Sequence, residues 1–322
     1  MGDCPGRLAS LSEQAKVKIL QSCLGHYYKN NSEYLFQCPH CNHHKKKLSI
    51  NIEKNVFKCW VCDWSGKDVY RVVRRYGTHS NRSEWRKFDQ EIEIKDFAEL
   101  LFGDVDTQVV QEVPLPKEFI SLANKNLPKT SLYPLNYLHS RGIGKADIIR
   151  WKIGYCSEGE YAGRVVVPSF SRTGKVNYFV TRTYADDWRK YLNPPISKEI
   201  IFNDLYLDFD EDLVLVEGVF DAVKVTGQAV PLLGSTLREE HPLFQKIVEN
   251  DTPIYLALDP DAKKKTDRLI QLMLRYDIET YVVDVPSHLD VGDMTKEQFL
   301  EIKQAAAFLN PENYLLGKIA GL

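Results

Sequence analysis

The sequence predicts an α/β protein (α+β overall) in which a small N-terminal β-ribbon precedes a larger core built around a parallel sheet. Two observations predict this fold class. Two C-x2-C pairs lie in the first quarter of the chain, and the C-terminal half alternates short apolar strands with helices. A third observation, acidic residues at the ends of those strands, indicates where the functional site lies.

Length and composition are those of an ordinary globular protein. The 322 residues allow about two domains of about 150 residues each. The hydrophobic fraction of 43% and the charged fraction of 27% are typical of such proteins. No apolar run approaches the ~20 residues that span a bilayer, and the N-terminus lacks the apolar core of a secretory signal, so we expect no membrane partner. We expect a cytoplasmic protein, whose seven cysteines do not form a disulfide framework.

Four cysteines carry the strongest local motif. They form two pairs with the overall spacing C-x2-C-x17-C-x2-C, at Cys38, Cys41, Cys59 and Cys62. Each C-x2-C turn aims two thiolates at one point, and two such turns complete the tetrahedron that zinc prefers in a structural site. The alternative, four cysteines merely buried in a core, does not account for this spacing. The segment between the pairs predicts two strands of a β-ribbon.

Histidines and basic residues surround the cysteine pairs. The histidines are His40, His43 and His44. Because four thiolates already complete a zinc site, we expect these histidines to be solvated or to face nucleic acid. The run Lys45–Lys47 lies near the aromatic residues Phe57, Trp60 and Trp64. Such a combination suits single-stranded nucleic acid. A lysine run alone is also common on a solvated face. The net charge of −2 favours neither interpretation.

The segment after the ribbon predicts little regular structure. Residues 68–77 predict a helix that ends at Gly77. Residues 78–116 contain few large apolar side chains, and we expect a tether with one short helix near 96–102.

The C-terminal half predicts a parallel sheet. Four apolar segments, each followed by a helix-forming segment, lie at 212–218, 229–235, 253–259 and 279–285. Continuous apolar strands separated by helices are typical of a parallel sheet covered on both faces. The expected organisation is a zinc-binding domain over 1–76, a linker region over 77–116, an N-terminal core subdomain over 117–210, a parallel α/β subdomain over 211–300 and a C-terminal helical tail over 301–322.

Acidic residues follow three of the four predicted strands. They are Glu217 after the first, Asp259 and Asp261 after the third, and Asp290 and Asp293 after the fourth. Because ligand sites in such sheets lie beyond the carboxyl ends of the strands, we expect these side chains to lie at one edge. Like charges packed together are unfavourable unless cations neutralise them, and oxygen-only ligands select a hard divalent metal, above all magnesium. One such acid alone would be read as a solvated loop residue.

The motifs in this half resemble those of a known family. VEGVFDAV, LLGS, ALDPDA and LDVGDM are similar to the successive motifs of the Toprim fold. YLHSRGIGKADIIRWKIGY resembles a segment of the RNA polymerase core of DnaG-type primases, and RVVVPSF, VTR and KYLNPP resemble the basic motifs of that core in the same order. The zinc ribbon is similar to the template-reading module of that family. The resemblance covers about residues 35–75 and 130–300.

The resemblance implies roles for individual residues. The resemblance implies that Glu217, Asp259 and Asp261 are catalytic residues, which would also bind magnesium. As further magnesium ligands it implies Asp221, Asp290 and Asp293, although the ALDPDA and DVGDM variants of the motifs leave the choice between the last two open. As contacts to template or nucleotide phosphates it implies Arg164, Arg182 and Lys190. Arg141 would organise the core or form a structural salt bridge.

The activity that the resemblance implies is that of a DNA primase, which makes short RNA primers on single-stranded DNA from ribonucleoside triphosphates. Zinc would be structural, magnesium catalytic, and 211–300 the Toprim subdomain. The all-cysteine zinc site resembles that of bacteriophage primases and implies the host cytoplasm if a phage encodes the chain. Only about twenty residues follow the Toprim helices, and the sequence contains no G-x4-GK[ST] motif. Both observations imply a separate replicative helicase as partner.

Two alternatives from other classes remain at this point. A Toprim-type metal-dependent nuclease would use the same carboxylates, because one fold serves several functions. A non-catalytic zinc-ribbon DNA-binding protein would not require the carboxylate set at all.

Overall fold

The computed structural model describes residues 5–88, 111–234, 236–309 and 314, and the chain forms two compact units. Unit 1 comprises residues 1–107 with 310–322, and unit 2 comprises residues 108–309. The helix expected near 96–102 lies outside the described residues. Within the described part of the chain, no helix is both long and apolar enough to cross a membrane.

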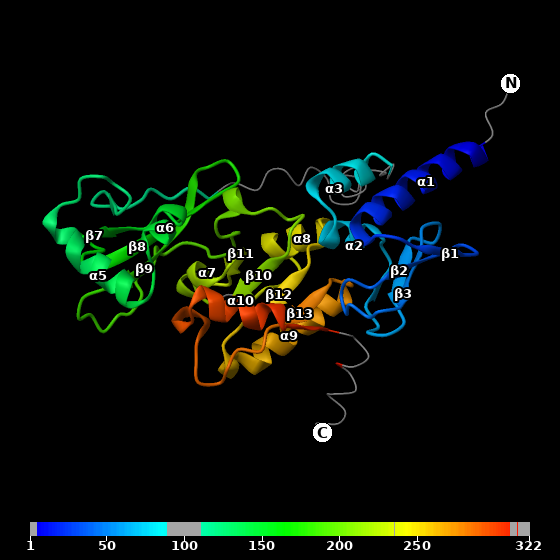
Figure 1. The fold of residues 1–322 in the computed structure, drawn as a ribbon. Helices are drawn as coiled ribbons and strands as arrows, with labels where there is room; N and C mark the ends of the chain where they lie inside the picture. The colour runs from blue at the N-terminus through cyan, green and yellow to red at the C-terminus, as the bar shows by residue number, and fades with distance from the viewer. Residues whose placement is uncertain (1–4, 89–110, 235, 310–313, 315–322) are drawn as a thin grey trace. The chain divides into compact units, whose positions relative to one another are not determined.

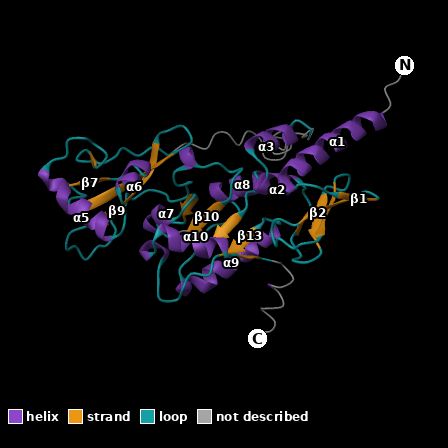
Figure 2. Ribbon diagram, viewed as in Figure 1, coloured by secondary structure: helices purple, strands orange, loops and turns teal. Residues whose placement is uncertain are grey.

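Unit 1 contains an antiparallel sheet and a small group of helices. Its described elements are α1 (Pro5–Leu24), β1 (Tyr28–Asn30), β2 (Glu33–Gln37), β3 (Lys46–Asn51), β4 (Val56–Cys59), β5 (Ser65–Gly66), α2 (Tyr70–Tyr76) and α3 (His79–Arg86). The five strands pair in chain order, from β1 to β5. Figures 1 and 2 draw β1 and β2 of this sheet together with α1 of the same unit. The two strands expected between the cysteine pairs are β3 and β4, and they pair antiparallel as a ribbon requires.

The ribbon uses two of its aromatic residues as its core. Phe57 is 2% exposed and Trp64 is 0% exposed, and their ring centroids lie 4.6 Å apart. The expectation that these two rings offer stacking surfaces is therefore wrong, because a unit this small needs its largest apolar side chains for burial. Trp60, which is 66% exposed, keeps the expected accessibility.

The segment expected to be a linker begins with a helix of unit 1. Thr78 and Asn81 form a reciprocal capping box at the start of α3, and Trp85 in that helix is 1% exposed. Helix α3 packs against α1 and α2. At the other end of the segment, Val113 N donates to Val176 O over 2.9 Å in unit 2. The predicted linker of 77–116 therefore includes residues that belong to unit 1 at one end and to unit 2 at the other.

Unit 2 contains two sheets. The elements of its first part are β6 (Ile120–Ser121), η1 (Lys129–Ser131), α5 (Leu132–Ser140), α6 (Lys145–Arg150), β7 (Gly154–Cys156), β8 (Arg164–Phe170), β9 (Val176–Thr183) and η2 (Asp204–Tyr206). The elements of its second part are β10 (Leu213–Val216), α7 (Val219–Lys224), β11 (Gln228–Pro231), α8 (Pro242–Glu249), β12 (Ile254–Leu256), η3 (Pro260–Ala262), α9 (Lys263–Arg275), β13 (Thr280–Val282), η4 (Val291–Asp293), α10 (Lys296–Gln304) and β14 (Ala307–Phe308).

The predicted parallel sheet is present in the second part. The strand order is β11-β10-β12-β13-β14, with β14 antiparallel at one edge and the other neighbours parallel. Val214 and Val216 of β10 belong to a buried cluster that also contains side chains of α7 and α10. Because alternate residues of a strand face opposite sides, Leu213 and Leu215 face the side on which right-handed crossovers place α8 and α9. The strands of this sheet are therefore covered on both faces, as their continuous apolar sequences predict.

One core joins the two parts of unit 2. The antiparallel sheet β6-β7-β8-β9 contributes Val165, Val167 and Tyr178 to the same cluster as Val214. The predicted boundary between residues 300 and 301 falls inside α10, and β14 adds a strand beyond it. The parallel sheet thus extends to residue 308 and shares its interior with the sheet that precedes it.

The position of Leu215 makes it a test of this core. Leu215 is 0% exposed in the central strand β10. We expect Leu215→Ala to lower the free energy of unfolding by about 2–5 kcal/mol, because the substitution leaves a cavity that the sheet cannot close. Leu132→Ala, at a position that is 59% exposed, should change it by less than about 0.5 kcal/mol. Urea unfolding followed by circular dichroism measures both variants, and equal effects would contradict the two-faced burial of β10.

Candidate active site and metal centre

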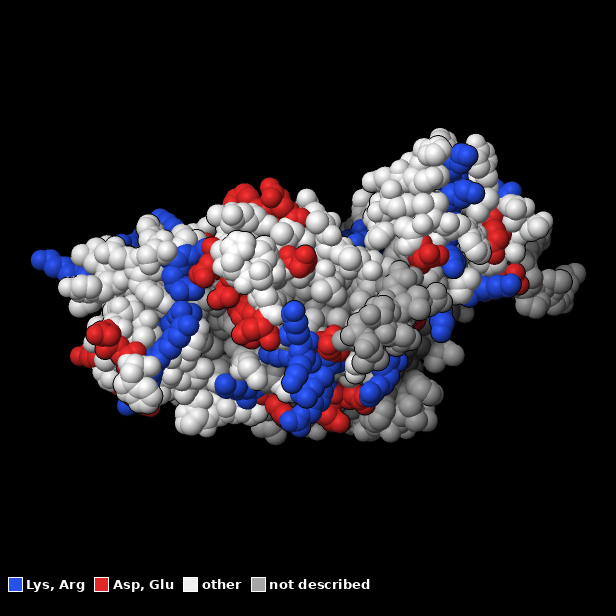
Figure 3. Space-filling model, turned by 90° about the horizontal axis from the view of Figure 1, so that it is seen from below, with Lys and Arg blue, Asp and Glu red and all other residues white. Residues whose placement is uncertain are grey.

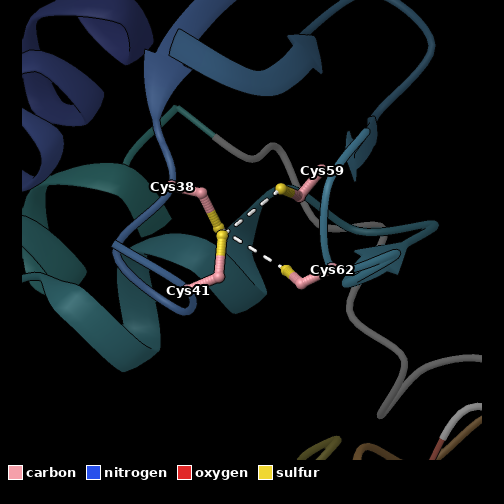
Figure 4. Close-up of side chains that lie close together, drawn as sticks. All are labelled: Cys38, Cys41, Cys59 and Cys62. Atoms are coloured by element: carbon pink, nitrogen blue, oxygen red, sulfur yellow. Dashed lines mark hydrogen bonds between the residues drawn. The ribbon is translucent and has the colours of Figure 1, made fainter. Parts of the chain in front are cut away.

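The four cysteines of unit 1 form a tetrahedral cluster. Their sulfur atoms all lie within 4.8 Å of one another (Figure 4). The distance from Cys38 Sγ to Cys62 Sγ is 3.9 Å, and that from Cys41 Sγ to Cys59 Sγ is also 3.9 Å. A regular tetrahedron with zinc–sulfur bonds of ≈ 2.3 Å has sulfur–sulfur edges of about 3.8 Å. The four predicted ligands therefore fit a structural zinc ion.

The two knuckles have the same backbone geometry. In each, the residue after the second cysteine has a positive φ, 50° at Asn42 and 57° at Asp63. Its amide donates to the carbonyl of the first cysteine, over 2.9 Å from Asn42 to Cys38 and 3.1 Å from Asp63 to Cys59. Asn and Asp adopt this left-handed conformation more readily than other side chains, so both turns are encoded locally.

The thiols of the cluster differ in how readily they ionise. Burial, together with hydrogen bonds to Cys59 and Cys41, raises the pKa of Cys62 to about 11. Burial also acts on Cys59, but hydrogen bonds with the backbone of Cys62 and Val61 lower its pKa overall. Zinc binds the thiolate form, so binding of the ion and loss of the protons are coupled.

His40 lies beside this cluster instead of facing solvent. Its Nδ1 atom is 3.7 Å from Cys62 Sγ, and its ring stacks on that of the buried Trp64 with centroids 5.6 Å apart. The expectation of a solvated His40 is therefore wrong, because the ring fills space between a ligand and the ribbon's core. His43 and His44 lie apart from the ligands, with their ring centroids 4.4 Å from each other.

Carboxylates meet at the carboxyl edge of the parallel sheet in unit 2. Glu217 follows β10 directly, Asp259 follows β12 at the start of η3, and Asp290 precedes η4. Asp221 lies in the first turn of α7, where its Oδ2 accepts a hydrogen bond from Gly218 N over 2.8 Å. A Cβ atom at Gly292 would lie 2.7 Å from Asp221 Oδ1, so glycine allows the η4 loop to approach this carboxylate.

The carboxylates act on one another electrostatically. Burial, and after it the charges of Asp221, Glu217, Asp290 and Asp261 in that order, together raise the pKa of Asp259 to about 7. Burial also raises the pKa of Asp221, to which the charges of Asp290 and Glu217 contribute. The structure thus brings five of the six predicted acids within electrostatic reach of one another.

Asp293 lies in a different charge environment. Its Oδ1 atom is 3.7 Å from Arg141 Nη2, and its charge acts on Lys224. The charge of Asp290 instead adds to the burial that raises the pKa of Asp221 and of Asp259.

The donor set of the cluster fits a hard divalent cation. Among the described residues, no donor lies within hydrogen-bonding distance of Glu217 Oε1, although this oxygen is buried. A buried carboxylate oxygen without a donor is unfavourable unless a cation approaches it. Within the described part of the chain, only the cysteine cluster brings three or more such ligand atoms within 4.8 Å of one another, so no three of the carboxylates lie that close together. Such spacing suits magnesium, which keeps several waters and binds one or two carboxylates together with substrate phosphates.

Two arginines lie beside the carboxylates. The guanidinium carbons of Arg141 and Arg182 lie 5.6 Å and 5.1 Å from the ring centroid of Phe220, the residue before Asp221. Arg182 Nη1 also donates to the hydroxyl of Tyr191 over 2.7 Å. Opposite charges are therefore adjacent, and the face drawn in Figure 3 likewise has acidic and basic side chains next to one another.

Arg164 does not occupy a phosphate-binding position. It is 1% exposed, it forms an ion pair with Asp187, and its Nη2 donates to Arg189 O over 2.8 Å. The expectation that Arg164 touches a phosphate is therefore wrong in this structure, since its donors hold a loop of the chain itself. Lys190, in the same loop, is exposed, and its contact with a phosphate stays a prediction.

Sequence reasoning missed Lys224 and Tyr191. Lys224 is 6% exposed, and burial lowers its pKa, as does the charge of Arg141. It follows Asp221 by three residues on α7, a spacing that places two side chains on one helix face and could have indicated it. Tyr191 lies in the KYLNPP motif, but nothing in the sequence indicates its hydrogen bond to Arg182.

The chain was compared with protein families, curated proteins and solved structures. No family model matches the chain. A curated DNA primase of Staphylococcus epidermidis is 23% identical over 340 residues, which cover 86% of this chain and 56% of the relative. A DNA primase of Deinococcus radiodurans is 23% identical over 306 residues, which cover 79% and 52%. The chain is similar to the bacterial DNA primases. It spans about half the length of these curated primases.

A solved primase structure is also similar. The zinc-binding and RNA polymerase domains of the Aquifex aeolicus primase match 94% of this chain and 86% of that chain, with 20% identity and a TM-score of 0.48. These three relatives are bacterial proteins, so the expected likeness to bacteriophage primases stays a prediction.

Removal of one cysteine tests the metal centre. We expect Cys41→Ser to reduce bound zinc from about one ion per chain to near zero, because three thiolates leave the tetrahedron open. Elemental analysis of the purified chain measures this content. Cys23→Ser provides the control, since Cys23 lies outside the cluster. Zinc retained by Cys41→Ser, or lost from Cys23→Ser, would contradict the assignment.

Removal of one carboxylate charge tests the acidic cluster. Folding raises the pKa of Asp259 from 3.8 to about 7, so ionisation of this group opposes folding above about pH 4 and does so fully above pH 7. Without added magnesium, we expect Asp259→Asn to raise the free energy of unfolding at pH 8 by on the order of 1 kcal/mol, and by less at pH 5. Thermal unfolding at the two pH values measures the gain.

Magnesium provides the matched comparison. The ion should stabilise the original chain at pH 8 more than it stabilises Asp259→Asn, because the variant lacks one ligand charge. A variant that is less stable than the original chain at pH 8 without the ion would contradict the repulsion.

Proposed function

We propose that the chain is a DNA primase, a nucleotidyltransferase that makes short RNA primers on single-stranded DNA from ribonucleoside triphosphates. The observation that carries the proposal is the carboxylate cluster with Arg141 and Arg182 at its side, in a chain that is similar to bacterial DNA primases over 86% of its length. Carboxylates that hold divalent cations beside phosphate-binding arginines are the groups that phosphoryl transfer requires.

Each carboxylate has a proposed role. Glu217, Asp259 and Asp261 would hold magnesium, with Asp221 and Asp290 in support. Asp290 is favoured over Asp293 because it acts on Asp221 and Asp259, whereas Asp293 pairs with Arg141. When bound, magnesium polarises the α-phosphate and stabilises negative charge on the attacking and leaving oxygens.

The basic side chains would bind the charged parts of the substrates. Arg141 and Arg182 would bind the triphosphate, because their guanidinium groups flank Phe220 next to the cluster. Lys190, which is exposed, would contact the template backbone. Arg164 would support these contacts from the interior through Asp187.

The zinc ribbon would bind the single-stranded template. Its exposed aromatic residues carry basic partners: Lys58 Nζ lies 5.1 Å from the ring centroid of Trp60, and Lys46 Nζ lies 4.5 Å from that of Tyr28. Rings and cations combined in this way suit unpaired bases and phosphates. A separate replicative helicase as partner rests on the resemblance alone.

RNA synthesis is the direct test. The full chain, single-stranded DNA of mixed sequence, magnesium and four ribonucleotides, one of them labelled, should yield short RNA. We expect the double variant Asp259→Ala, Asp261→Ala to lower the yield by about 100-fold or more, because the metal ligands are lost. Gel electrophoresis of the labelled products measures the yield.

The outcomes separate the three candidate functions. Template cleavage without RNA, lost in the double variant, would replace the primase by a nuclease. DNA binding without either reaction, and equal in the double variant, would favour a non-catalytic DNA-binding protein.

A further inference from the structure

Trp188 is the most exposed of the tryptophans. Its side chain is 91% exposed, whereas Trp64, Trp85 and Trp151 are at most 6% exposed. An exposed indole does not contribute the burial of apolar surface through which aromatic side chains stabilise folded proteins. Single exposed apolar residues are common on protein surfaces, so exposure alone does not indicate a site. The loop that carries Trp188 supplies the further observations.

The loop is fixed from the interior of unit 2. Arg164, which is 1% exposed, forms an ion pair with Asp187, and its Nη1 donates to Lys190 O over 3.5 Å. Arg189 N donates to Asp187 Oδ1 over 2.8 Å, and this bond, the Arg164 guanidinium and the charge of Arg189 lower the pKa of the Asp187 carboxyl. Hydrogen bonds thus hold the residues on both sides of Trp188. A buried arginine whose Nη1 and Nη2 atoms both bond to one exposed loop is an unusual use of a desolvated charge.

Basic and aromatic side chains continue from Trp188 to the carboxylates. The guanidinium carbon of Arg189 lies 5.8 Å from the Trp188 ring centroid. Tyr191, 43% exposed, accepts a hydrogen bond from Arg182, whose guanidinium lies over Phe220 beside Asp221. Burial raises the pKa of Tyr191, and the charge of Asp221 adds to the rise. The loop that carries Trp188 therefore also carries Tyr191, whose partner Arg182 lies beside the proposed active site in the same unit.

We propose that Trp188 stacks on a base of single-stranded DNA that follows this loop towards the carboxylates. The inference rests on the proposed function, to which it adds a template-binding residue. Unpaired bases expose the ring faces on which indoles stack, and the cations beside Trp188 suit the phosphates of the same strand. Bases in a duplex are stacked on each other, so a duplex offers no face to Trp188.

Two substitutions separate aromatic stacking from apolar contact. We expect Trp188→Leu to weaken binding of a labelled single-stranded oligonucleotide by about tenfold, which corresponds to about 1.4 kcal/mol and is the magnitude of one stacked base. Trp188→Phe should remain within about threefold of the original chain, because phenylalanine also stacks. Fluorescence anisotropy with the full chain measures both. Neither variant changes a charge, so the salt dependence should stay the same, whereas Arg189→Gln should lower its slope by about 0.7 per lost phosphate contact.

Tryptophan fluorescence gives an independent readout. In a Trp60→Phe background the other tryptophans apart from Trp188 are buried, so the oligonucleotide should quench emission from Trp188. Adding Trp188→Phe to this background should remove the quenching. Trp188 makes few contacts with the chain, so the unfolding midpoint of Trp188→Leu should equal that of the original chain.

The outcomes distinguish this inference from the proposed function. Binding by Trp188→Leu as tight as that of the original chain, or equal weakening of duplex binding, would overturn the stacking role even in a chain that makes RNA. Absence of RNA synthesis by the original chain, with the binding and quenching effects intact, would overturn the primase proposal and leave the stacking role supported.

Discussion

Repulsion among carboxylates at one edge of a parallel sheet is the constraint on which unit 2 depends. The sheet places Glu217 and Asp259 at neighbouring strand ends, and the charges of the surrounding acids help to raise the pKa of Asp259 to about 7. A parallel arrangement makes this convergence unavoidable, since every strand ends at the same edge. The chain relieves the repulsion in part with Arg141, and a bound cation would relieve the rest. The repulsion that destabilises the cluster would therefore also be the reason for its proposed affinity for metal.

The shared core of unit 2 fixes the arginines relative to the carboxylates. Arg182 extends from β9 in the antiparallel sheet, and Asp221 lies on α7 of the parallel sheet. Both sheets contribute to one buried cluster, and Phe220 in that cluster contacts Arg182 directly. Interiors packed at this density do not deform continuously, so the distance between the two kinds of charge is set by packing. Unit 1 has a smaller sheet, and the four converging cysteines, once they bind zinc, would stabilise it together with apolar burial.

The features that the sequence predicts correctly are those encoded over short distances. The cysteine spacing and the apolar strand segments require no knowledge of distant residues, and both are confirmed. The errors concern residues whose environment depends on tertiary partners. Arg164 matches a basic motif, but its partner Asp187 lies 23 residues further along the chain. Trp64 matches a stacking pattern, but packing on Phe57 buries it. A motif therefore identifies the residue type that a position carries, while the direction of its side chain follows from the fold.

Arg164 also explains how a basic motif can serve binding without touching a ligand. A guanidinium in the interior must satisfy its donors, and in this chain the ion pair and carbonyls of residues 187–190 do so. The same bonds restrict the conformations of the loop, which would lower the entropic cost if a DNA strand orders the exposed side chains. Substitution of Arg164 would then weaken the proposed binding through Trp188 and Lys190 while leaving both side chains in place. Under the proposed function, this buried basic residue would contribute to recognition through the order of the loop and not through its own charge.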